Sequence, residues 1–251
     1  MLSYSVCIDA LFEGKDLYES LGFLDQKGFK RFEFWSWADK DIAKLAAFIT
    51  HRGMTISTFC VPNIGLNDPA RRGKFRQALE TTIAAAKQLG VSKLITLTGD
   101  ELPGVPRVKQ RQSIIEGLKS CVPLLTASDM MVLVEPLNIR VDHQGYYLSR
   151  SDEAFAIVRD VGDRHVKVLF DIYHQQITEG NILASITANL QAIGHFHAAA
   201  VPGRHELYLG ELDYPFIFRK IAEAGYDGDI GLEYFPTDNV ELGLSRLPPL
   251  P

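Results

Sequence analysis

The feature that most constrains the fold is an alternation that repeats along all 251 residues. Short apolar runs of strand length are separated by segments whose apolar residues have helical spacing, and Gly or Pro marks the boundaries. Such alternation is typical of parallel α/β folds, because each parallel strand needs a crossover connection. Eight strand runs in this length favour a closed (β/α)₈ barrel, a TIM barrel, over an open sheet. We therefore predict a single TIM-barrel domain over residues 1–251, ending in a Pro-rich, extended tail at 247–251.

The pattern predicts the bounds of most elements. The expected strands cover 4–8, 31–34, 54–60, 93–97, 131–134, a run from 166 to Asp171, 193–197 and 229–233. The expected helices cover 17–26, 42 to the residue before Gly53, Asp68-Pro69 to Gly90, 113–128, 151–161, 181–190 and 213–223. Ser151 and Asn181 are the predicted N-caps of two of these helices. The polar segment 138–148 is predicted to be a long functional loop.

Composition and charge exclude several classes of function. The chain is 46% hydrophobic and 23% charged, as an ordinary globular protein is, and its net charge of −5 disfavours a nucleic acid as partner. The three cysteines are scattered, which is typical of a reducing compartment. No apolar run approaches the ~20 residues that span a bilayer. We expect a soluble, unprocessed, cytoplasmic protein that binds no membrane.

Four predicted strands end in a residue that can bind a metal ion: Glu135, Asp171, His197 and Glu233. The carboxyl ends of parallel strands meet at one face of a barrel, where TIM-barrel active sites lie. Taken singly, each has a structural explanation, such as a salt-bridged carboxylate at the rim, a capping aspartate or a core histidine. His195 lies two residues before His197 on the same strand face, so the pattern leaves open which histidine joins the ring.

The ring predicts a divalent cation. One imidazole and three carboxylates form a hard, oxygen-rich ligand set that suits Mn²⁺ or Mg²⁺, with Co²⁺ or Zn²⁺ as alternatives. Without a cation, three carboxylates in a partly buried site would repel one another. A cation held there can bind two adjacent oxygens of an α-hydroxy carbonyl compound and stabilise the enediolate that forms when a C–H proton leaves. Glu135 and Glu233, the only glutamates of the ring, are assigned to remove and return that proton.

Residues outside the ring are predicted to contact the small hydroxy-carbonyl substrate. His174 and Arg204 are expected to bind its oxygens, Glu33 to make a further polar contact and Trp35 to form a wall. His205 lies in a loop that could close over the site. The alternatives are that His174 and Arg204 are solvated at the surface, and that His205 pairs there with Glu206.

The motifs that carry these residues resemble those of a known family. VLVEPLN with GYYL, LFDIYHQQ, VPGRHE with GELDY, and IGLEYFP are similar to the hydroxypyruvate isomerase family within the xylose-isomerase-like TIM-barrel superfamily. The resemblance runs from FEFW in the second strand to Pro236. It implies a divalent-metal site at the four ring residues, with the two glutamates as acid and base. It further implies that His174 and Arg204 bind substrate, and that the protein forms dimers or tetramers.

Two departures from the family pattern bear on the substrate. Hydroxypyruvate isomerases usually have Gln at the position of His197, where the related ketose 3-epimerases have His. The stretch Leu207–Leu209 replaces a Gly/Pro-rich segment. The leading hypothesis is isomerisation of hydroxypyruvate to tartronate semialdehyde or of a related keto acid or sugar. Epimerisation at C3 of a free ketose is the alternative, and an abasic-site endonuclease-like hydrolase or a non-catalytic sugar-binding barrel is more distant.

Overall fold

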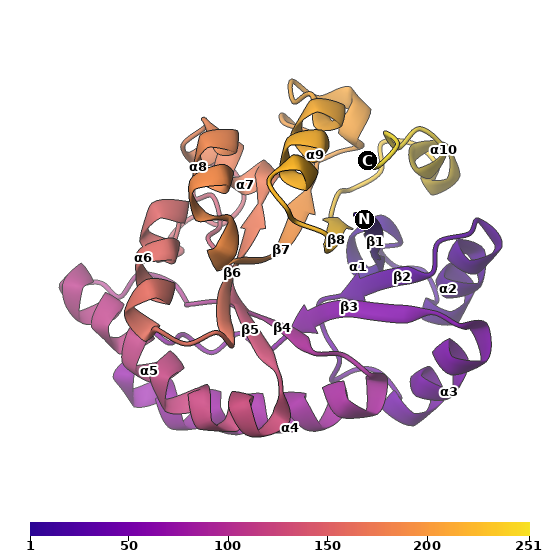
Figure 1. The fold of residues 1–251 in the computed structure, drawn as a ribbon. Helices are drawn as coiled ribbons and strands as arrows, with labels where there is room; N and C mark the ends of the chain where they lie inside the picture. Colours follow the sequence, from indigo (N-terminus) through magenta and orange to yellow (C-terminus); the bar gives the residue numbers. More distant parts are fainter.

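The computed structural model describes residues 1–251 and contains a closed barrel of eight parallel strands (Figure 1). The strands follow one another around the barrel in chain order, and β1 closes it by pairing with β8. Their bounds are β1 Ser3–Cys7, β2 Arg31–Phe34, β3 Thr55–Cys60, β4 Lys93–Thr96, β5 Met131–Val134, β6 Val166–Asp171, β7 Ile193–Ala198 and β8 Asp229–Leu232. The predicted barrel is confirmed, and the strand bounds agree with the prediction to within one residue.

The helices lie outside the ring of strands (Figure 1). They are α1 Ile8–Leu11, α2 Leu17–Gln26, α3 Ile42–Arg52, α4 Arg72–Leu89, α5 Arg107–Ser128, α6 Ser151–Val161, α7 Ile172–Thr178, α8 Ile182–Asn189, α9 Tyr214–Glu223 and α10 Val240–Ser245. Three single turns of 3-10 helix occur at Pro69–Arg71, Leu190–Ala192 and Leu207–Leu209. None of the helices combines the length and the apolar character that crossing a bilayer requires.

Local signals set the helix ends as expected. The Asp16 carboxylate accepts hydrogen bonds from the backbone N–H groups of Tyr18 and Glu19, and so caps the start of α2. Helices α3 and α4 end at Gly53 and Gly90, whose φ angles of 61° and 70° are left-handed. Glycine adopts this conformation at no steric cost, which is why it ends the helices there.

One predicted helix start and the predicted capping roles of two residues differ from the structure. Helix α5 begins at Arg107, before the predicted start at residue 113. The prediction missed its first turns because they are polar and show no apolar periodicity. Ser151 is the first residue of α6 and Arg150 occupies the N-cap position; the Ser151 hydroxyl instead contacts Glu179 and Ser185. Asn181 does occupy the N-cap position of α8, but its side chain accepts no capping hydrogen bond.

The barrel interior is apolar beneath Glu135 and Asp171. Ile95, Leu133 and Leu169 form a buried cluster separate from the large core between strands and helices. Side chains two residues apart on a strand share a face, so Glu135 follows Leu133, and Asp171 follows Leu169, on the inward face. The apolar cluster therefore forms a floor beneath the polar residues that end the strands.

Both ends of the chain lie close together (Figure 1). The Tyr4 hydroxyl, near the start of β1, donates a hydrogen bond of 2.7 Å to the carbonyl oxygen of Pro248. Tyr4 is paired with Ile230 at the start of β8, so the tail returns to the end of the barrel at which the strands begin. The tail 247–251 contains no helix or strand.

Candidate metal and substrate site

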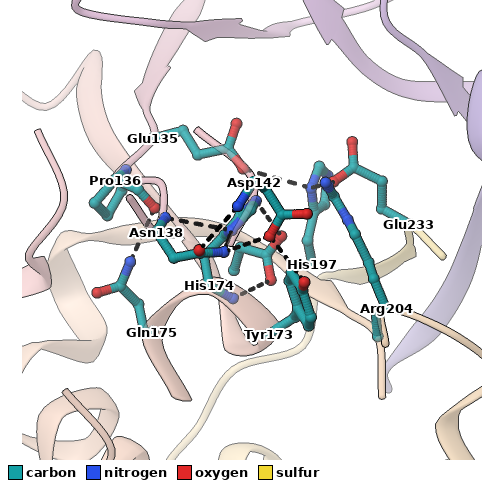
Figure 2. A network of polar contacts seen from close by, with 12 residues as sticks. Glu135, Pro136, Asn138, Asp142, Tyr173, His174, Gln175, His197, Arg204 and Glu233 are labelled. Atoms are coloured by element: carbon teal, nitrogen blue, oxygen red, sulfur yellow. Dashed lines mark hydrogen bonds and ion pairs between the residues drawn. The ribbon is translucent and has the colours of Figure 1, made fainter. Parts of the chain in front are cut away.

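The four predicted ring residues come together at the carboxyl ends of β5 to β8. Glu135, Asp171, His197 and Glu233 are all buried, and one ligand atom from each lies within 4.8 Å of the others. His197 Nδ1 is 3.4 Å from a Glu233 oxygen and 3.9 Å from a Glu135 oxygen. Figure 2 shows the two glutamates on opposite sides of His197. The structure therefore assembles one imidazole and three carboxylates around a common point.

The open choice between two histidines has a geometric answer. His197 turns Nδ1 toward the carboxylates and is paired with Asp171 across β6 and β7. His195 is paired one level lower, with Leu169, and does not belong to the ring. Its Nε2 lies 3.0 Å from one oxygen of Glu33, whose other oxygen lies 2.9 Å from His197 Nε2. His197 is thus the histidine in position to bind a cation.

The residues present fit a divalent cation. His197 Nδ1 is buried and has no hydrogen-bond partner in the protein. Burial lowers the pKa of His197, but the charges of Glu33 and Glu233 outweigh this and raise it well above its ordinary value. Without a cation, a proton on this imidazole therefore offsets the negative charge of the neighbouring carboxylates. A bound cation would neutralise that charge in its place. Carboxylate oxygens with one imidazole nitrogen are ligands that Mg²⁺ and Mn²⁺ accept.

Glu233 is held on several sides. Trp35 Nε1 donates a hydrogen bond of 2.5 Å to one of its oxygens, and an Arg204 guanidinium N–H donates to the other. Burial opposes ionisation of this carboxyl group, but Arg204 and His197 hold its pKa well below the ordinary value. Arg204, His197 and Trp35 therefore favour the ionised form of Glu233.

Glu135 lacks such partners, because its carboxylate accepts no hydrogen bond from the protein and the nearest cationic group is His197 at 3.9 Å. Burial raises the pKa of Glu135 well above its ordinary value, and Glu233 and Asp171 raise it further against the opposing effect of His197. Burial likewise raises the pKa of Asp171 to about 6. When no cation is bound, the surroundings thus favour the ionised form of Glu233 and the protonated form of Glu135.

Arg204 is buried, which excludes the alternative of a solvated arginine. Its guanidinium lies 5.3 Å from the ring centre of Tyr173 and 5.7 Å from that of Phe235. Its φ of 57° is left-handed, a conformation that non-glycine residues rarely adopt. Packing between two aromatic rings and pairing with Glu233 hold the side chain at the site despite this backbone geometry.

His174 is also fully buried and not at the surface. It lies in α7, where its backbone N–H donates to the Asp171 carboxylate at 3.2 Å. Asn138 Nδ2 lies 2.7 Å from His174 Nδ1, so Nδ1 accepts and the proton resides on Nε2, which is 3.6 Å from Asp171. Asn138 and the Tyr173 hydroxyl both donate to Asp142, which links the loop 138–148 to α7 (Figure 2).

A cavity of about 650 Å³ opens beside the ring. Its lining combines apolar and aromatic side chains with charged and polar ones. The apolar and aromatic residues include Trp35, Trp37, Val61, Leu97 and Phe235, and the charged and polar ones include Glu135, Asp142, His143, Arg204 and Glu233. Trp37, Asp142 and His143 were not identified from the sequence. The only signal for the last two was the length and polarity of the loop 138–148.

Two residues predicted to contact substrate lie behind the cavity wall. Glu33 is buried and faces two imidazoles, not the cavity. His205 places Nδ1 2.8 Å from the carbonyl oxygen of Phe235 and does not line the cavity. Glu206 accepts hydrogen bonds from the backbone and hydroxyl of Thr237, so the alternative pairing of His205 with Glu206 is absent.

Comparison with known proteins places this geometry in a family. The family model for the xylose isomerase-like TIM barrel matches residues 21–249. The 2-oxo-tetronate isomerase of Cupriavidus necator is 33% identical, over 93% of this chain and 95% of that protein. The hydroxypyruvate isomerase of Escherichia coli is 29% identical over 99% of each chain. A solved structure from Brucella melitensis, described as an AP endonuclease of family 2, is 28% identical with a TM-score of 0.93 over 98% of this chain and 97% of that one.

The match of the family model covers most of the chain, and the relatives match at nearly full length. The resemblance predicted from the strand-end motifs is confirmed by both comparisons. The chain belongs to the xylose isomerase-like TIM-barrel family.

Proposed function

We propose that the protein is a divalent-cation-dependent isomerase of small α-hydroxy keto acids. The observation that carries this proposal is that Glu135 and Glu233 lie on opposite sides of His197 (Figure 2) and both line a cavity with polar and apolar residues. The relatives named for hydroxypyruvate and 2-oxo-tetronate isomerisation support this substrate class. Hydroxypyruvate and its four-carbon analogue are therefore the leading substrates.

Glu135, Asp171, His197 and Glu233 would hold the cation, with Mn²⁺ or Mg²⁺ expected. A bound cation supplies a Lewis acid that polarises the substrate carbonyl and lowers the cost of the negative charge that develops on it. The protein's own residues then have to bind the substrate and move its protons. Arg204 lines the cavity and is the donor proposed to bind a substrate oxygen, whereas His174 is fully buried outside the cavity lining, with Nε2 3.6 Å from Asp171.

The proton transfer divides between the two glutamates. In the isomerisation, a C–H bond breaks at the hydroxyl-bearing carbon, a C–H bond forms at the former carbonyl carbon, and one proton passes between the two oxygens. Glu233, which Arg204 and His197 hold toward the ionised form, is suited to accept the carbon-bound proton, and Glu135, on the other side of His197 (Figure 2), lies where a proton can be returned to the neighbouring carbon. Proton exchange between these carboxyl groups and water would then carry solvent hydrogen into the substrate.

The test is proton NMR in D₂O with Mg²⁺-loaded enzyme and a panel of hydroxypyruvate, four-carbon keto acids and free ketoses. We expect deuterium at the carbon beside the carbonyl of a keto acid. Glu135→Gln and Glu233→Gln should each slow turnover by about 10²–10⁴-fold, the usual contribution of general acid–base catalysis. Glu153→Gln, on α6 and paired with Arg107, is the control and should keep wild-type turnover.

The position of the label separates the alternatives. Deuterium at C3 of a ketose with no keto-acid exchange would replace the proposal with 3-epimerisation. Cleavage of abasic-site DNA, which the name of the Brucella melitensis protein suggests as an assay, would replace it with hydrolysis. Full turnover by both glutamine variants would show that the two-glutamate mechanism is wrong.

A further inference from the structure

Glu33, at the end of β2, is buried and its carboxylate lies between two imidazoles. One oxygen is 2.9 Å from His197 Nε2 and the other is 3.0 Å from His195 Nε2. We propose that Glu33 is a positioning residue: by bridging His195 and His197 it holds the His197 ring with Nδ1 aimed at the three carboxylates. This inference rests on the proposed cation site.

The chemistry of the two groups sets the direction of the imidazole. An ionised carboxylate only accepts hydrogen bonds, so an imidazole nitrogen facing it must carry a proton. Once a cation takes the place of any proton on Nδ1, His197 keeps its remaining proton on Nε2, toward Glu33. Neither ring nitrogen of His197 makes a hydrogen bond of good geometry within the protein, but Nε2 lies 2.9 Å from Glu33 and Nδ1 faces the carboxylates of the ring, so Nδ1 is the nitrogen that offers its lone pair there. Without Glu33, either nitrogen of His197 could carry the proton.

His195 completes the arrangement from the other side. It lies two residues before His197 on the same strand face, and the two ring centres are 5.2 Å apart. By occupying the second oxygen of Glu33, it prevents that oxygen from being buried without a partner, which would be costly. The chain His195–Glu33–His197 thus supports the ring from beneath, with no member lining the cavity.

Gly231 on β8 provides the space for this chain. A Cβ atom added there would lie 2.3 Å from Glu33 Oε1 and 2.5 Å from Cδ2 of His197, distances that real contacts do not show. Both neighbours are themselves fixed by pairing and burial, so they have little room to move. The absence of a side chain at this inward-facing position therefore permits the contact between Glu33 and His197.

The first experiment compares cation affinity. Isothermal titration calorimetry with Mn²⁺ should show that Glu33→Gln binds about 10–100-fold more weakly than the wild type, the usual effect of losing such a support. Asp229→Asn is the matched control, because Asp229 is a barrel carboxylate at the opposite end of β8 that accepts from Ser57 at 2.8 Å. It should bind Mn²⁺ as the wild type does, even with reduced stability.

The second readout follows the proton itself. In the Mg²⁺-loaded protein, ¹⁵N–¹H NMR should show His197 with its proton on Nε2, protected from exchange. In Glu33→Gln the amide offers one acceptor oxygen for two imidazoles, so the Nε2 proton of His195 or His197 should lose its protection. His195→Asn should give a smaller loss of Mn²⁺ affinity, because Glu33 remains beside His197. If Glu33→Gln does not fold, the same two measurements on His195→Asn test the proposal.

The outcomes are separable. If the wild type binds Mn²⁺ and folded Glu33→Gln or His195→Asn binds it equally well with unchanged imidazole protons, the positioning role is wrong and the proposed function stands. If the wild type binds no Mn²⁺, the cation site itself is wrong, and the proposed function and this inference fall together.

Discussion

Glu135 and Glu233 occupy matching places in the barrel but different surroundings. Each follows the last residue of its strand, β5 or β8, each is 6% exposed, and each has an oxygen within 4 Å of His197 Nδ1. Glu233 accepts hydrogen bonds from Trp35 and Arg204, whereas Glu135 accepts none. The pKa of Glu233 is consequently lowered by these neighbours, while burial raises that of Glu135.

This difference shows that strand position alone does not determine the chemistry of a carboxyl group. The backbone delivers both glutamates to the ring, but side chains from the loops after β2 and β7 decide which one is ionised. Two carboxyl groups whose environments push their pKa values apart are suited to opposite roles as base and acid. The following predictions test that asymmetry, beginning with the largest expected effect.

Removing Arg204 should remove the main difference between the surroundings of Glu233 and those of Glu135. Arg204→Met leaves Glu233 buried without its cationic partner, and breaking a buried pair in this way costs about 3–5 kcal/mol. Urea unfolding of the metal-free protein at neutral pH should show this loss. Arg159→Met, which removes an exposed arginine on α6, should change stability little. A second substitution, Glu233→Gln, should recover part of the loss, and failure to recover any would place the role of Arg204 elsewhere.

A bound cation should also reduce the difference in pKa between Glu135 and Glu233, because it attracts both carboxylates. Mn²⁺ at 100 times its dissociation constant should stabilise the wild type by about 2.7 kcal/mol relative to the protein in EDTA. Thermal unfolding followed by circular dichroism measures this difference. Glu135→Gln and Glu233→Gln should both show a smaller gain at the same Mn²⁺ concentration. If Mn²⁺ stabilised both variants as much as it stabilises the wild type, the ion would bind outside the ring.

Trp35 supplies the neutral donor on the Glu233 side. Trp35→Phe removes the Nε1–H group while keeping an aromatic ring beside Phe235. A hydrogen bond to a charged group contributes about 1.5 kcal/mol or more, so kcat/KM should fall roughly tenfold. Trp37→Phe is the matched control, because Trp37 also lines the cavity but donates to Thr82. Equal losses in the two variants would attribute the effect to cavity shape.

The smallest effect is expected on the Glu135 side. Without a cation, burial raises the pKa of Glu135 and favours its neutral form, and its carboxyl group accepts no hydrogen bond, so Glu135→Gln should replace a neutral group by another of similar shape. The stability of the metal-free protein should change by no more than about 0.5 kcal/mol, as for a substitution that breaks no specific interaction. Glu233→Gln should destabilise it clearly in the same urea titration. A similar loss in both variants would contradict the asymmetry.

Strand-end residues were the part of the site that the sequence could predict. Alternation of side chains on a strand, together with the common direction of parallel strands, brings Glu135, Asp171 and Glu233 to one level. The choice between His195 and His197 was beyond this reasoning, because both side chains share a face. It depends on the β6–β7 register, which pairs His197 with Asp171.

Contacts between distant segments account for what was missed. Glu33 was expected to touch the substrate, but the space left by Gly231 lets it reach His197 instead. Asp142 and His143 line the cavity because Asn138 and Tyr173 hold their loop in place. Such contacts depend on how elements far apart in the sequence pack, and no local pattern of residues records that packing.

The hydrogen bond between Tyr4 and Pro248 has a practical consequence for handling the protein. It brings the tail back to the end of the barrel where the strands begin, while the ring lies where they finish. Met1 and Pro251 are both exposed. A purification tag, a fluorophore or a surface linker attached at either terminus would thus face away from the cavity, and a short peptide joining the two termini, with the chain opened at an exposed loop instead, would give a circular permutant whose cavity is left clear of the junction.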